Sequence, residues 1–78
     1  MVTYDSKDTK KIKDSFSLTM REIEILRKMM QGLKNREIAG TLFISEATVK
    51  THVNRIFKKM GVDNRSKAIM LAVDNNLF

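Results

Sequence analysis

One short stretch of this sequence, residues 47–60, collects side chains that could bind a polyanion. It contains four basic residues and no acidic one. Because a helix turns by about 100° per residue, its apolar residues would share one side. These are Val49, Val53, Ile56, Phe57 and Met60. The opposite side would present Ala47, Thr51, Asn54, Arg55 and Lys58, with Thr48, Lys50 and Lys59 on its flanks.

This two-sided pattern suits a helix that lies in the major groove of DNA. The groove admits one α-helix and exposes hydrogen-bond donors and acceptors on its base edges. Cations attract the flanking phosphates, and short polar side chains permit close approach. A basic helical face is, however, more often a face that only contacts water. The segments that precede residue 47 help to separate the two interpretations.

Those segments predict two helices joined by a tight turn. Thr19 and Glu22 have the spacing of a capping box at the start of a first helix, and Gly32 is suited to a left-handed stop at its end. Asn35 is the expected cap of a short second helix. Its apolar residues are Ile38, Ala39 and Leu42, and Gly40 within it is interpreted as a tolerated surface glycine.

The remaining capping and helix-terminating residues predict two further helices. Phe43 and Ile44 form the expected turn, and Ser45 caps a third helix over about residues 46–60 that Gly61 ends. Asn64 caps a fourth helix over about residues 65–75. No segment alternates with the period of a strand. We therefore expect an all-α, four-helix bundle that contains a helix-turn-helix motif.

Composition excludes several classes of function. Of 78 residues, 15 are Lys or Arg and 9 are Asp or Glu, which gives a net charge of +6. Cysteine is absent and His52 is the only histidine, so we expect no disulfide, metal site or cofactor. No nucleophile–base set or glycine-rich phosphate loop is visible, so we expect no enzyme. Without an apolar run of ~20 residues or a leader pattern, we expect a cytoplasmic protein with no membrane partner.

The chain divides into two parts. Residues 1–15 carry charges of both signs and few apolar side chains, so they are interpreted as a flexible N-terminal tail or an interdomain linker. Residues 16–78 form the expected helix-turn-helix domain. His52 borders the apolar side of the third helix, and a packed or hydrogen-bonded structural role is favoured over a phosphate contact.

Four runs of residues resemble the LuxR/FixJ-type DNA-binding domain, over residues 17–78. They are Leu18-Thr19-x-Arg21-Glu22-x-Glu24-Ile25-Leu26, Gly32-Leu33-x-Asn35-x-Glu37-Ile38-Ala39, Leu42-x-Ile44-Ser45-x-x-Thr48-Val49-Lys50-x-His52-Val53, and Lys59-Met60-Gly61-Val62-x-Asn64-Arg65. The end of the chain is similar to the effector domain of NarL-like response regulators, and its length is similar to stand-alone members such as GerE.

The resemblance implies a transcription regulator whose third helix reads double-stranded DNA. The positions that match base contacts are Lys50, Thr51 and Asn54. Those assigned to phosphates are Asn35, Arg36, Ser45, Thr48, Arg55 and Lys58. Some relatives carry a longer cation in place of Asn54, and since asparagine can pair with adenine, an adenine contact is hypothesised there.

The fourth helix contains more apolar side chains than one buried face can accommodate. Ala68, Ile69 and Ala72 match the family's inward positions. Met70, Val73 and Leu77 would then remain exposed, and the resemblance implies a homodimer through them. The alternative is that Leu71 and Met70 cover the base of the first helix.

Two questions about the whole protein stay open at this point. The chain is either a stand-alone regulator or the output domain of a two-component response regulator with an N-terminal receiver domain, and the second is slightly favoured. The alternative function is a helix-turn-helix interaction module that contacts RNA polymerase or another regulator without reading a DNA sequence.

Overall fold

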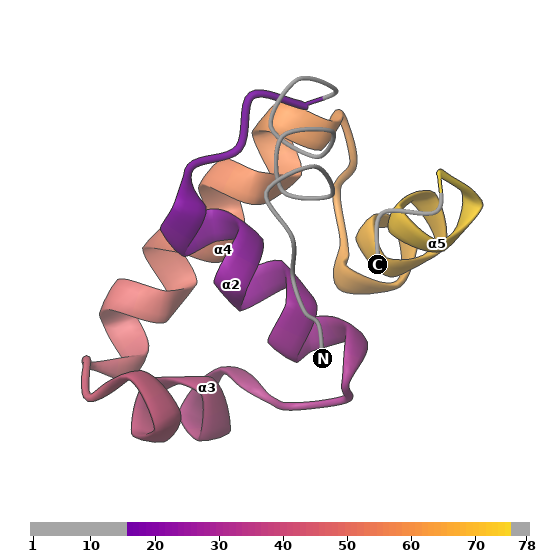
Figure 1. Cartoon of the computed structure of the whole chain (residues 1–78). Coiled ribbons are helices and arrows are strands. Elements are labelled where there is room, and N and C mark those ends of the chain that lie inside the picture. The colour runs from indigo at the N-terminus through magenta and orange to yellow at the C-terminus, as the bar shows by residue number, and fades with distance from the viewer. Residues whose placement is uncertain (1–15, 76–78) are drawn as a thin grey trace.

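The computed structural model describes residues 16–75, and these form four helices with no strand among them. The helices are α2 (Met20–Met30), α3 (Asn35–Leu42), α4 (Glu46–Met60) and α5 (Arg65–Asp74). Figure 1 shows α4 passing beside α2, with α3 and α5 toward its two ends. The all-α expectation is confirmed. The predictions for residues 1–15 and for Leu77 lie outside the described residues.

Local capping bonds set the start and end of α2 as the sequence predicts. The Thr19 hydroxyl accepts from the Glu22 N–H at 3.1 Å, and the Glu22 carboxylate accepts from the Thr19 N–H at 2.9 Å. This reciprocal pair satisfies two backbone donors that the first helical turn leaves free. Gly32 follows the helix at a φ of 90°, and the Leu33 N–H returns to the Lys28 carbonyl at 3.1 Å.

The expected cap of α3 was wrong by one residue. Lys34 precedes the helix, and its N–H donates to the Glu37 carboxylate at 2.7 Å. Asn35 is the first helical residue, and its side-chain oxygen accepts instead from Arg65 at the start of α5. Since the side chain of Glu37 reaches back to satisfy this end of α3, the Asn35 amide is free to bind another element.

The core lies where α2, α3 and α4 meet. Its fully covered side chains include Leu26, Ile38, Val49 and Ile56. Burial of an aliphatic side chain contributes about 1.5–3 kcal/mol, so these positions hold the angle between the helices of the motif. Gly40 is exposed, and a Cβ built there would meet no atom within 4 Å, which confirms a tolerated surface glycine.

Helix α5 packs on the bundle through small side chains. Ala68 and Ala72 are buried, as expected for inward positions, whereas Ile69 is only half-buried. Leu71 packs against the core but Met70 is exposed, so the alternative in which both cover the first helix is wrong for Met70. Among residues 16–75, no helix is long and apolar enough to span a membrane.

Candidate nucleic-acid interface

Helices α3 and α4 form the predicted helix-turn-helix motif. The turn consists of Phe43, Ile44 and Ser45, and the Ile44 N–H donates to the Ala39 carbonyl at 3.1 Å. The Ser45 hydroxyl caps α4 by accepting from the Thr48 N–H at 3.0 Å. The two hydroxyls of Ser45 and Thr48 lie 2.9 Å apart and share a hydrogen bond. This network fixes the direction in which α4 leaves the turn.

The two sides of α4 differ as the sequence predicts. Its core side is covered at Val49, Val53, Ile56 and Met60, with Phe57 half-buried. Its other side is open along the whole helix. The exposed residues there are Ala47, Thr48, Lys50, Thr51, Asn54, Arg55 and Lys58. The three residues predicted to touch bases therefore lie together on one accessible surface, within about one turn of each other.

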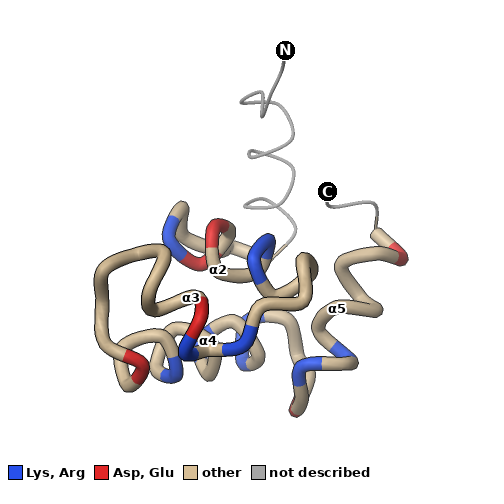
Figure 2. Tube along the Cα trace, turned by 90° about the horizontal axis from the view of Figure 1, so that it is seen from below, with Lys and Arg blue, Asp and Glu red and all other residues tan. Residues whose placement is uncertain are grey.

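The cations of α4 differ in what they contact. Lys50, Arg55 and Lys58 form no ion pair within residues 16–75, so their charges face solvent. Figure 2 shows the basic positions along the chain, several of them on α4. Exposed cations without an ion-pair partner attract the phosphates of a nucleic-acid backbone.

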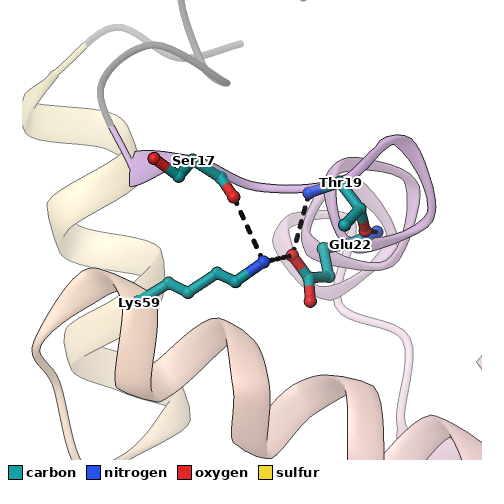
Figure 3. A network of polar contacts seen from close by, with 4 residues as sticks. All are labelled: Ser17, Thr19, Glu22 and Lys59. Carbon is teal, nitrogen blue, oxygen red and sulfur yellow. Dashed lines mark hydrogen bonds and ion pairs between the residues drawn. The ribbon is translucent and has the colours of Figure 1, made fainter.

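Lys59 is the exception, because it is bound to the rest of the bundle. Its Nζ donates to the Glu22 carboxylate at 2.7 Å and to the Ser17 carbonyl at 3.1 Å (Figure 3). Glu22 exposes only 2% of its surface. The contact joins α4 to the start of α2, and it removes Lys59 from the cations available to a ligand.

The same contact determines the ionisation of Glu22. Burial raises the pKa of this carboxyl, but the hydrogen bond from Lys59, the Thr19 N–H and the Lys59 charge outweigh burial and lower the pKa below its ordinary value. Glu22 is therefore ionised at neutral pH, and its charge is matched by Lys59 inside the bundle rather than opposing an anion outside it.

The predicted phosphate-contacting residues are placed at the start of α3 and along the turn and α4. All are exposed except Asn35, which is half-buried and bonded to Arg65. The exposed ones are Arg36, Ser45, Thr48, Arg55 and Lys58. Arg36 forms no ion pair among the described residues. Ser45 and Thr48 already bond each other, so they are less free than the sequence suggested.

His52 lies at the border of the core, as expected. The residue is half-buried, and its Nδ1 is buried without a hydrogen-bond partner. His52 therefore packs against the bundle, and its Nδ1 forms no hydrogen bond within residues 16–75. Within residues 16–75, no three His, Cys, Asp or Glu side chains gather in a way that could hold a metal ion.

The structure adds one exposed aromatic residue that sequence reasoning placed only in a turn. Phe43 is 94% exposed and adopts a φ of 58°. A bulky side chain rarely takes this left-handed conformation, which costs about 1–2 kcal/mol. The sequence did contain a signal for this conformation. A sharp turn between the two helices needs one residue with positive φ, and the turn segment contains no glycine that could adopt it.

The expected exposure on α5 is also observed. Met70 and Val73 are 63% and 56% exposed, whereas Ala68 and Ala72 on the other side are buried. Two neighbouring apolar side chains in solvent are suited to a contact with another surface.

Comparison with known proteins agrees with this architecture. The family described as "Bacterial regulatory proteins, luxR family" matches residues 16–72. The CsgBAC operon transcriptional regulatory protein of Escherichia coli is 55% identical over 62 residues, which are 80% of this chain and 29% of that protein. The nitrate/nitrite response regulator protein NarP of E. coli is 46% identical over 59 residues, 74% of this chain and 27% of that protein.

A solved structure gives the same result. The response regulator ChrA of a heme-sensing two-component system superposes with a TM-score of 0.74 and 57% identity, over 78% of this chain and 30% of that chain. The chain thus spans less than a third of the length of these relatives. The resemblance seen in the sequence is confirmed across the helices that carry the motif, and the chain belongs to the luxR family of bacterial regulatory proteins.

Proposed function

We propose that this domain binds double-stranded DNA and regulates transcription, with α4 in the major groove. Lys50, Thr51 and Asn54 contact base edges in this arrangement. The observation that carries the proposal is the division of α4 into a buried apolar side and an exposed side. From residue 47 onward the exposed side has no acidic residue, and three of its cations form no ion pair within residues 16–75. A helix fills the major groove well, and short polar side chains permit its close approach.

The phosphates on either side of the groove are contacted by residues of both motif helices. On α3 these are Asn35 and Arg36, and from the turn onward they are Ser45, Thr48, Arg55 and Lys58. Phosphate contacts fix the position of the helix, and base contacts select the sequence. Arg36 lies at the start of α3 and Arg55 on the exposed side of α4, and neither forms an ion pair within residues 16–75, so both can turn toward an anion.

Two copies bind together through α5. Met70 and Val73 provide the apolar contact; Leu77, the third residue predicted there from the sequence, lies outside the described residues. A core of this size is also marginal in stability on its own, so association would stabilise it. Two docked copies place their half-sites about one helical turn apart, ~10 base pairs between centres.

The names of the relatives favour a regulator with a receiver domain. NarP and ChrA are response regulators, and this chain matches less than a third of each. We therefore propose that the domain is the output half of a two-component response regulator, preceded by a phosphorylatable receiver domain. A cytoplasmic location follows from that function.

Titration of duplex DNA at a series of salt concentrations tests the function. Three cations per copy are assigned to phosphates, Arg36, Arg55 and Lys58, so with two copies bound log K should fall with log salt at a slope of roughly −5. Absence of binding at low salt would refute the proposal. It would favour the alternative function, a module that contacts RNA polymerase or another regulator without binding a specific DNA sequence. A pull-down with purified polymerase would then test that alternative.

A further inference from the structure

Arg65, the first residue of α5, reaches across the bundle to the start of α3. Its Nη2 donates to the Asn35 side-chain oxygen at 2.8 Å and to the Leu33 carbonyl at 3.4 Å. Arg65 and Asn35 are both half-buried, and they lie 30 positions apart in the sequence. Helix α5 therefore holds the side chain of a residue that the proposed function assigns to a phosphate.

The chemistry of this pair dictates how the Asn35 amide is oriented. A guanidinium group has donors and no acceptor, so the amide must turn its oxygen toward Arg65. Its nitrogen then lies on the other branch of the side chain, away from Arg65. Within residues 16–75 that nitrogen forms no hydrogen bond, and it is not one of the buried polar atoms left without a partner. Two N–H donors are thus available to an acceptor outside the domain.

We infer that Arg65 is a positioning residue for DNA binding: it orients the Asn35 amide so that the N–H donors meet a phosphate oxygen. The inference rests on the proposed function. A phosphate diester oxygen accepts hydrogen bonds only, so an amide turned the other way would present its own oxygen to the phosphate and repel it. Arg65 exerts this effect from within the bundle without touching the DNA.

A double-mutant cycle in DNA affinity tests the coupling between the two residues. The full 78-residue chain is titrated with a random-sequence duplex of about 20 base pairs at ~50 mM salt. Arg65→Met should weaken binding by about threefold to tenfold, the factor for one hydrogen bond. In the Asn35→Ala background the same substitution should cause no further loss, because the amide that Arg65 orients is absent.

The matched control is Lys67→Met, which removes the same charge from the first turn of α5 without touching Asn35. Lys67 pairs with Asp63 instead, at 3.0 Å. Any loss that this control shows is subtracted from the loss caused by Arg65→Met. An equal corrected loss in both backgrounds would overturn the inference, as would no corrected loss at all. Failure of the wild-type chain to bind the duplex would instead refute the proposed function.

A second variant keeps the test independent of folding defects at Arg65. Asn35→Asp retains an acceptor for Arg65, so the melting temperature should not fall, but it lacks the two N–H donors. Its DNA affinity should drop at least as far as that of Asn35→Ala. Wild-type affinity in a folded Asn35→Asp protein would show that no donor at this position is used.

Discussion

Two adjacent lysines near the end of α4 should respond to the same substitution in opposite ways. Lys59 donates to the buried Glu22 carboxylate and to the Ser17 carbonyl, whereas Lys58 is exposed and forms no ion pair among the described residues. Methionine preserves most of the aliphatic length of lysine and removes only the charged group. The pair of variants Lys58→Met and Lys59→Met therefore separates a structural cation from one available to DNA.

The loss of stability in Lys59→Met follows from the geometry. A hydrogen bond to a charged group contributes about 1.5–3 kcal/mol, and the Lys59 side chain is one-third exposed, so solvent screening favours the lower end. We expect a loss of ~1.5–2 kcal/mol, which for a domain of this size lowers the melting temperature by roughly 10 °C. Lys58→Met should stay within about 0.5 kcal/mol of wild type.

DNA binding should show the reverse order. Lys58→Met should reduce the salt slope by about 0.9 for each bound copy, since one phosphate contact is lost. Lys59→Met should leave the slope unchanged at a temperature where the variant is folded, because its charge faces Glu22. Thermal melts followed by circular dichroism and salt titrations on the same preparations measure both quantities.

Acid gives an independent check on the Lys59–Glu22 contact. The folded state lowers the pKa of Glu22, so its contribution to stability is complete above the ordinary glutamate pKa of about 4.3 and is lost as pH falls through the folded value. The stability gap between wild type and Lys59→Met should therefore narrow below about pH 4. Equal melting temperatures of wild type and Lys59→Met at pH 7 would refute the reasoning. So would stability losses of Lys59→Met and Glu22→Gln that add within about 0.5 kcal/mol in the double variant.

Three further substitutions have defined outcomes. Asn54→Lys should shift base preference from adenine toward guanine in a site library, and an unchanged preference at every position would exclude a base contact from Asn54. Phe43→Asn should stabilise the fold by ~1 kcal/mol in thermal melts, since asparagine tolerates the left-handed conformation; a lower melting temperature would mean that the exposed ring packs on something. Val73→Glu should weaken dimers, and an unchanged sedimentation profile on DNA would exclude this face of α5 as the interface.

Much of the fold was predictable because the interactions that start and end its helices join residues close together in the sequence. The bonds between Thr19 and Glu22 and between Ser45 and the Thr48 N–H span three residues, so residue type and spacing suffice to indicate where α2 and α4 begin. The two sides of α4 were equally accessible to prediction, since the 3.6-residue period alone sorts apolar from polar positions. Family resemblance then supplied the expected role of each exposed residue.

The sequence by itself thus determined the helices, the turn and the side of α4 that meets solvent. Only the tertiary structure decided that Lys59 is bound while Lys58 has no ion-pair partner in the described part of the chain, and that Asn35 faces Arg65 instead of capping its own helix. The partners in these two contacts lie 37 and 30 residues apart, and their meeting depends on the angles at which α2, α3, α4 and α5 pack. No periodicity within one helix encodes those angles, because they arise from the joint packing of side chains in the shared core.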